Sequence, residues 1–194
     1  MELHEVTQEL FGPLTLLAGD WEGSSGTDFS FHHDEQGTGS TPYFETVQLK
    51  PFGPVDNGSQ HLYGLDYRMA AWRMTELNDD PFHTEVGYWL YDPADQILSR
   101  CFMVPRGSVL IASGRVAPAA TEFLLTAQRG SVTNGILSNS YLDEHARTDT
   151  YEIRISVAPD TWNYESTTIL TMSNLDAPLR HTDRNSLTRT KGQQ

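Results

Sequence analysis

Strict alternation of apolar and polar side chains is the feature that most limits the folds open to this chain. In Tyr151–Val157 the Tyr, Ile and Val residues fall on one side, and Glu, Arg and Ser fall on the other. Successive side chains of a β-strand point to opposite faces, so this pattern predicts a strand with one buried face. Similar stretches bring the predicted total to about ten strands, the others lying at 43–49, 61–73, 83–91, 97–104, 108–116, 122–128, 138–147, 162–172 and 182–189.

Clusters of Gly, Pro, Asn and Asp separate these stretches, at 51–58, 78–81, 92–95, 105–107, 117–120, 130–135 and 158–160. Such residues favour reversing turns, and a further polar, glycine-rich segment at 32–41 is interpreted as a loop. Sequential strands joined by short turns suit an up-and-down barrel, because closure removes exposed sheet edges. We therefore expect an all-β, antiparallel up-and-down barrel of about ten strands, wide enough to enclose a cavity. A β-sandwich is the alternative.

Helix is predicted only in Glu5–Ala18, where Leu10, Leu14 and Leu17 fall on one stripe. The Gly12-Pro13 pair is expected to divide this segment into two short pieces. No linker, solenoid repeat or long charge block marks a second domain in the 194 residues. The expected organisation is one β-barrel domain over 1–194, with a helical cap at 1–18 and the barrel at 19–191.

Charge and composition exclude several classes of partner. The chain has 13 basic and 26 acidic residues, for a formal net charge of −13, which disfavours nucleic acids and anionic membrane surfaces. No apolar run approaches the roughly 18 residues that span a bilayer, and the acidic N-terminal segment is unlike a secretory signal. The single cysteine, Cys101, excludes an internal disulfide. We expect a cytoplasmic protein, monomeric or homodimeric, with neither nucleic-acid nor membrane partners.

Familiar catalytic motifs do not occur. The sequence has no Gly-x-Ser-x-Gly elbow, no His-Glu-x-x-His helix and no glycine-rich phosphate loop. His32 and His33 precede Asp34 and Glu35, but in a glycine-rich context we interpret this as a solvated loop rather than a metal cluster. Cys101 is expected to be buried and unreactive, because no basic cluster beside it would lower its pKa. No certain catalytic residue follows from these motifs.

A tryptophan lies between two glycines where the predicted cap meets the first strand, in the segment Gly19-Asp20-Trp21-Glu22-Gly23. In a small barrel such a tryptophan fills one end, while the glycines allow a tight bend and close approach of strands. Gly19, Trp21 and Gly23 are therefore interpreted as a structural signature, one that also occurs in lipocalins and fatty-acid-binding proteins.

The chain resembles the nitrobindin family, which is similar to fatty-acid-binding proteins. The resemblance rests on the Trp21 segment, on Tyr43-Phe44-Glu45, on Phe82-His83-Thr84-Glu85-Val86-Gly87-Tyr88-Trp89 and on a late histidine, His181. It implies a ten-stranded antiparallel barrel that holds haem b in a partly open cavity, with a histidine near the C-terminus bound to the iron. It also implies ferric iron, reversible binding of nitric oxide and isomerisation of peroxynitrite to nitrate. An enzyme of this kind would be a haem-dependent peroxynitrite isomerase.

The resemblance assigns roles to two histidines. It makes His181 the candidate proximal ligand of the haem iron, with Asp183 on the same strand face as a partner able to orient the ring. It aligns His83 with a cavity-facing histidine able to donate a hydrogen bond to a bound diatomic or to a haem substituent. Gly87 shares the strand face of His83 and, lacking a side chain, leaves room there for a planar group. The segment 180–187 is more polar than the family's usual ending. A lipocalin-like or fatty-acid-binding-like carrier of an apolar small molecule, without haem, is therefore the alternative, and a structural or partner-binding barrel is the third.

Met103 and Met172 are further candidates for contact with a cofactor, because thioether side chains adapt to irregular apolar pockets. Other residues expected to line the barrel are Phe102, Val104, Val109, Ile111, Phe123 and Leu125.

Overall fold

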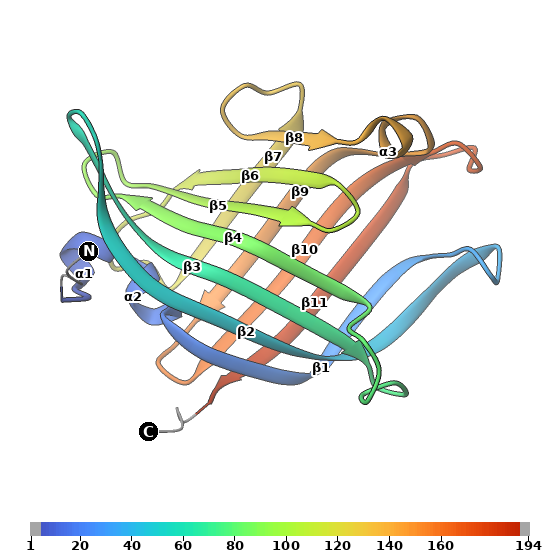
Figure 1. Ribbon diagram of the computed structural model, residues 1–194, viewed down its shortest axis with the longest axis horizontal. Coiled ribbons are helices and arrows are strands. Elements are labelled where there is room, and N and C mark those ends of the chain that lie inside the picture. Colours follow the sequence, from blue (N-terminus) through green and yellow to red (C-terminus); the bar gives the residue numbers. More distant parts are fainter. Residues whose placement is uncertain (1–4, 191–194) are drawn as a thin grey trace.

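The computed structural model describes residues 5–190, which form a closed barrel of eleven strands with three short helices (Figure 1). The elements are α1 (Gln8–Phe11), α2 (Leu14–Leu17), β1 (Gly19–His32), β2 (Gly37–Asn57), β3 (Gln60–Arg73), β4 (His83–Asp92), β5 (Ile97–Val104), β6 (Ser108–Arg115), β7 (Glu122–Arg129), β8 (Gly135–Ser138), α3 (Ser140–His145), β9 (Ala146–Val157), β10 (Thr161–Met172) and β11 (Leu179–Arg189). The predicted all-β barrel is thus confirmed, with one strand more than the ten expected.

The strands follow one another around the barrel almost in chain order. Strand β1 pairs with both β2 and β11, which closes the sheet, and the short β8 lies between β6 and β7. All pairings are antiparallel except that of β7 with β8. Alternation along each strand separates an inner face from an outer face, as in β9, where Tyr151, Ile153, Ile155 and Val157 are all buried.

Two segments predicted as breaks are largely strand. Strand β2 continues through the predicted turn at 51–58 as far as Asn57, so that only residues 58 and 59 reverse the chain. In the predicted loop at 32–41, strand β1 ends at His32, β2 begins at Gly37, and the turn between them is short. Backbone pairing with β1, for example Ser40 opposite Phe29, stabilises this polar stretch although it lacks apolar side chains.

The predicted strand at 138–147 is wrong in its centre, where helix α3 forms instead. Asn139 precedes the helix, and its side-chain oxygen accepts a hydrogen bond of 2.9 Å from the backbone N–H of Leu142. The Asn139 amide also donates to the carbonyl of Arg106 at 2.7 Å, which ties the helix to the turn between β5 and β6. A helix cap therefore outweighs the local alternation on which the strand prediction depended.

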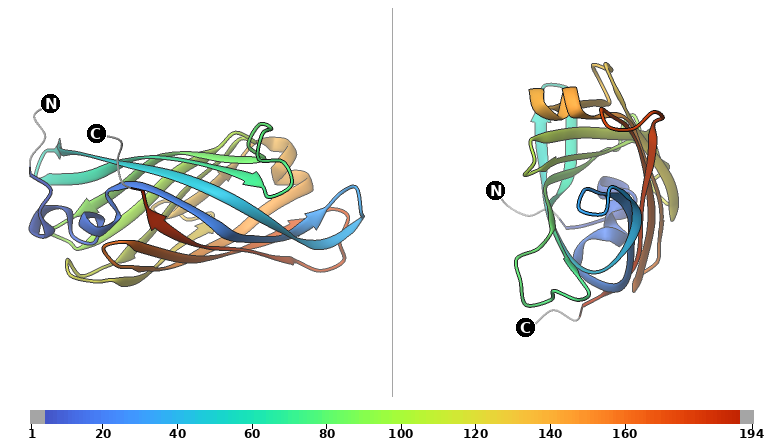
Figure 2. Two further views of the ribbon diagram at one scale, coloured as in Figure 1. Left: turned by 90° about the horizontal axis from the view of Figure 1, so that it is seen from below. Right: turned by 90° about the vertical axis from the view of Figure 1, so that its right-hand side faces the viewer.

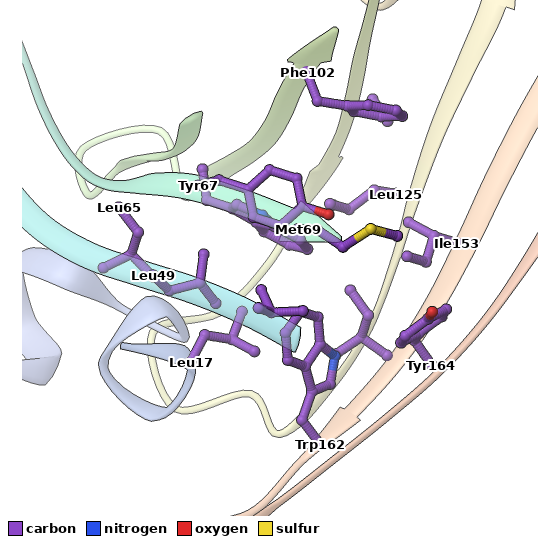
Figure 3. Close-up of a cluster of buried hydrophobic side chains, with 14 of the residues drawn as sticks. Leu17, Leu49, Leu65, Tyr67, Met69, Phe102, Leu125, Ile153, Trp162 and Tyr164 are labelled. Atoms are coloured by element: carbon purple, nitrogen blue, oxygen red, sulfur yellow. The ribbon is translucent and has the colours of Figure 1, made fainter. Parts of the chain in front are cut away.

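One end of the barrel is filled by side chains. As predicted, the Gly12-Pro13 pair separates two short helices, and α1 and α2 lie at this end (Figure 2). Behind them, Trp162 packs edge-on against Trp21 and Trp89, with ring centroids 5.9 and 6.2 Å apart. Figure 3 shows Trp162 among Leu17, Leu49 and other buried side chains. Of the helices in the described residues, none has the length and apolar character needed to cross a membrane.

Candidate functional site

A cavity of about 780 Å³ occupies the other end of the barrel. Its mouth is formed by the β1–β2 turn, the β3–β4 connection, the β5–β6 turn and α3, and Trp162 contributes to its floor. Much of its wall is apolar, with Met69, Phe102, Leu110, Ile153, Leu170, Met172 and Leu179 among the lining residues. Figure 3 shows Met69, Phe102 and Ile153 converging from different strands. This volume lies within the range of ~300–1,000 Å³ typical of small-molecule sites.

His181 lies on β11 with its side chain in the cavity wall. Its Nε2 atom is 2.5 Å from Oδ1 of Asp28 on the neighbouring strand β1. Asp28 also accepts a hydrogen bond of 2.6 Å from the Ser30 hydroxyl. Burial acts to raise the pKa of Asp28, but the hydrogen bond and positive charge of His181 outweigh it, so this pKa lies below its ordinary value. The sequence offered no means of pairing these two side chains, which are 153 residues apart.

Asp183 does not orient His181. Asp183 lies directly opposite Asp28 in the ladder of β1 and β11, and its carboxylate accepts a hydrogen bond from the Tyr43 hydroxyl instead. Residues two apart on a strand share a face, yet they are separated along the strand, whereas a residue of the adjacent strand comes closer. The partner expected for His181 on its own strand is therefore replaced by a diagonal neighbour.

His83 also lines the cavity, at the start of β4. Its Nε2 atom is 3.2 Å from Oε1 of Glu85, and Oε2 of Glu85 accepts a hydrogen bond of 2.6 Å from the Tyr67 hydroxyl. The Arg100 guanidinium forms a buried ion pair with the same carboxylate. Burial acts to raise the pKa of Glu85, but the charge of Arg100 and the contact with His83 lower it to about 2.

A second polar network surrounds Glu45, which is buried in β2. Its Oε2 atom accepts hydrogen bonds from the Tyr164 hydroxyl at 2.7 Å and the Asn185 amide at 2.9 Å. The Tyr164 hydroxyl lies 2.8 Å from that of Tyr43, which reaches Asp183. Burial, together with the charge of Asp183, raises the pKa of Glu45 to about 8. Burial likewise raises the pKa of Asp183 to about 6, despite its bond to Tyr43.

Glu45 and Arg100 were not expected in the cavity, although the alternation of apolar and polar residues contains a signal for both. Glu45 lies between Tyr43 and Val47 on the apolar side of its strand, and Arg100 lies between Leu98 and Phe102 on the apolar side of β5. Charged residues are almost never fully buried unless they are paired. A charged residue at a position that the alternation assigns to the buried face of a strand therefore indicates an internal polar network.

Of the two methionine candidates, only Met172 lies in the cavity wall. Met103 is 49% exposed on the outer face of β5, because its neighbour Phe102 points inward and adjacent strand residues point to opposite sides. The same reason places Val109 and Ile111 outside, whereas Val104 lines the cavity and Phe123 and Leu125 belong to the barrel interior. The space expected beside Gly87 is filled: a Cβ atom there would lie 2.0 Å from the carbonyl oxygen of Cys101.

The Gly19, Trp21 and Gly23 segment lies at the filled end, away from the cavity. The Trp21 indole donates a hydrogen bond of 2.8 Å to the carbonyl of Leu17, and the Arg189 guanidinium lies 4.2 Å from the ring centroid. A Cβ atom on Gly23 would come within 2.5 Å of the Ser186 carbonyl oxygen, so the glycine permits close approach of β1 and β11. These contacts join the helical cap to both terminal strands of the barrel.

Comparison with known proteins agrees with the β-barrel fold described above. A family model described as "THAP4-like, heme-binding beta-barrel domain" matches residues 10–189. Among solved structures, the chain is similar to Rv2717c from M. tuberculosis, with a TM-score of 0.65 and 16% sequence identity over 92% of this chain and 95% of that one. This likeness shows a shared fold. No curated protein matches the sequence.

Proposed function

The chain belongs to the THAP4-like, haem-binding β-barrel domain family, and from this premise we propose that its cavity binds haem b and that His181 would hold the iron. The observation that carries the proposal is the pairing of His181 with Asp28 in the wall of a cavity of about 780 Å³. A histidine that ligates a metal gives its other ring nitrogen to a carboxylate or carbonyl, which fixes its tautomer and raises its basicity. Within the described residues, the contact with Asp28 is the hydrogen bond that the His181 ring makes, and it holds the imidazole at the cavity wall.

The rest of the cavity is compatible with the same group. Apolar side chains such as Met69, Phe102 and Met172 provide a surface for the porphyrin ring. Arg73 and Arg106 lie among the lining residues at the mouth, where guanidinium groups suit the two carboxylates that haem carries.

We propose nitric oxide or peroxynitrite as the small molecule handled at this site. Bound ferric haem would supply an open coordination position at which nitric oxide binds or peroxynitrite is isomerised to nitrate. His83 is the candidate to donate a hydrogen bond to such a molecule, because it lines the same cavity and is held by Glu85 at 3.2 Å.

The alternative, a carrier of an apolar molecule without haem, is less well matched. An apolar ligand would lie against Glu45, Glu85, Arg100 and Asp183, all of which line the cavity. Burying polar groups against a ligand that cannot hydrogen-bond is costly. The apolar part of the wall is the feature that favours this alternative.

Titration with ferric haem tests the proposal. The protein is expected to shift and sharpen the Soret band with one haem per chain, and His181→Ala is expected to abolish this spectrum. His61→Ala is the matched control, because His61 lies on the β2–β3 hairpin outside the cavity. A spectrum that survives in His181→Ala but disappears in His83→Ala would transfer the ligand role to His83. No shift of the Soret band in the unaltered protein would leave the carrier function.

Conversion of peroxynitrite to nitrate by the haem-loaded protein tests the activity separately.

A further inference from the structure

Four cavity-lining side chains form one continuous chain of hydrogen bonds from strand β2 through β10 to β11. The carboxyl group of Glu45 lies 2.7 Å from the Tyr164 hydroxyl, which lies 2.8 Å from the Tyr43 hydroxyl. The Tyr43 hydroxyl in turn contacts the carboxyl group of Asp183. We call this set the Glu45 chain and define it as Glu45, Tyr164, Tyr43 and Asp183, all of which line the cavity.

The Glu45 chain spans an interruption in the barrel wall. Tyr43 belongs to β2 and Tyr164 to β10, and the sheet places β1 and β11 between these strands. The ladder of β1 with β11 is interrupted here, because residues 23–26 of β1 and 185–187 of β11 lie between its regular pairs. Glu45 lies opposite residue 23 of β1, and Tyr43 lies opposite residue 26. The contact between the two tyrosines therefore joins β2 to β10 on the inside of the barrel, across the interrupted ladder.

Counting hydrogen atoms determines the protonation of this chain. Its three oxygen-to-oxygen contacts need one hydrogen each. The hydroxyl groups of Tyr43 and Tyr164 supply one hydrogen each, and an ionised carboxylate supplies none. If both carboxyl groups were ionised, Tyr164 would donate to Glu45 and Tyr43 to Asp183. The two hydroxyl oxygens would then face each other at 2.8 Å without a hydrogen between them, so one carboxyl group keeps its proton.

Glu45 is the carboxyl group that keeps the proton. Its side chain is 2% exposed, whereas Asp183 is only half-buried. No ion pair of the cavity-lining residues in the described part of the chain includes Glu45. Burial and the charge of Asp183 therefore raise its pKa to about 8. The titratable groups that face Glu45 are Tyr43 on its own strand, Tyr67 on β3, Glu85 on β4, Tyr164 on β10 and Asp183 on β11.

We propose that the Glu45 chain is a pH-sensitive switch in the cavity wall, closed while Glu45 keeps its proton and open once that proton passes to solvent. In the closed state Glu45 donates to Tyr164, Tyr164 to Tyr43, and Tyr43 to Asp183. In the open state Tyr164 turns its hydrogen towards the ionised Glu45, and the two hydroxyl oxygens repel each other. The contact that joins β2 to β10 is then lost, and the wall loosens at the interrupted ladder.

The switch bears on ligand binding because Tyr43 and Tyr164 line the same cavity as His181. Its consequence for haem rests on the proposed function: haem bound against this wall is expected to dissociate faster when Glu45 is ionised. The switch itself needs no ligand. A chain that binds no haem would still show it, so failure of the switch and failure of haem binding are distinguishable.

Infrared spectroscopy of the ligand-free protein tests where the proton lies. A protonated carboxyl group absorbs apart from a carboxylate, and the band that Glu45→Gln removes belongs to Glu45. This band is expected at neutral pH and is expected to disappear as the pH rises through about 8. A Glu45 carboxyl group that is already ionised at neutral pH would overturn the proposal.

Tyr43→Phe tests the hydrogen count. Without the Tyr43 hydroxyl, the hydrogen of Tyr164 alone satisfies its contact with Glu45. The midpoint of the Glu45 band is therefore expected to fall by about one pH unit, the value of one hydrogen bond. Tyr151→Phe is the matched control and should leave the midpoint unchanged, because Tyr151 lines the cavity but its hydroxyl accepts from Arg100 in the other network. Equal midpoints in Tyr43→Phe and the unaltered protein would refute the count.

Hydrogen exchange of the ligand-free protein tests the opening of the wall. Protection factors of backbone amides in β1 and β11, corrected for the intrinsic effect of pH on exchange, are expected to fall about fivefold when Glu45 ionises, as for the loss of one hydrogen bond. Tyr43→Phe has no tyrosine contact to lose, so its protection factors should not change over the same pH range. Constant protection in the unaltered protein would overturn the switch.

Discussion

His181 and Asp28 lie on the two strands that close the barrel, and 2.5 Å separates the imidazole Nε2 from the carboxylate Oδ1. The contact joins residues near opposite ends of the chain, and both side chains line the cavity. The pairing fixes the orientation of the ring on which the proposed haem site depends. The role of His181 therefore depends on closure of the barrel.

Replacing Asp28 by Asn is expected to weaken haem binding by roughly 10–100-fold, the usual effect of removing a carboxylate behind a ligand histidine. Spectroscopic titration measures the change. Asp56→Asn is the matched control, because Asp56 forms a pair of the same 2.5 Å length with His61 on the exposed surface. Equal affinities for the two variants would show that Asp28 does not support the ligand.

Replacing Arg100 by Met is expected to lower the free energy of unfolding by about 3–5 kcal/mol, because it leaves Glu85 buried without its counter-charge. Urea denaturation measures this loss. The double variant Arg100→Met with Glu85→Gln is expected to recover much of it, since the uncompensated charge is gone. Arg129→Met removes a half-exposed pair with Asp143 and is expected to cost no more than ~1 kcal/mol. Equal costs at the two arginines would contradict this reasoning.

Glu45 is expected to make stability fall with rising pH. Its pKa is raised from 4.5 to about 8, chiefly by burial, so the folded state holds its proton across a range in which the unfolded state releases it. The stabilising contribution is complete below pH 4.5 and is lost as pH rises towards 8. Glu45→Gln should therefore flatten the plot of unfolding free energy against pH in this window. The exposed Glu22→Gln variant is the control, and parallel curves for Glu45→Gln and the unaltered protein would refute the assignment.

Replacing Gly87 by Ala is expected to destabilise the fold by about 1–3 kcal/mol, because the added methyl would push against backbone atoms of β5. Its Cβ would lie 2.0 Å from the Cys101 carbonyl oxygen and 2.7 Å from Cα of Phe102. Thermal unfolding compares it with Gly37→Ala, where the nearest atom would be 3.8 Å away. Similar melting temperatures for the two variants would show that β4 and β5 can separate freely.

Alternation predicted most strands correctly, since each half-buried strand records its two faces in its own sequence. It failed at helix α3, where hydrogen bonds of Asn139 to Leu142 and to Arg106 override the local pattern. The assignment of faces also failed where Phe102 and Met103 were both placed inside, although neighbours on one strand cannot share a face.

The sequence by itself determined the barrel class and the two-part helical cap, whereas His181 and His83 were singled out by the family resemblance. It did so because alternation, turn residues and short motifs are local properties of the chain. Only the tertiary structure decided that Asp28 holds His181, that Arg100 neutralises Glu85, and that Glu45 and Asp183 share one network. These side chains come from different strands, so the register of the closed sheet determines which charges meet.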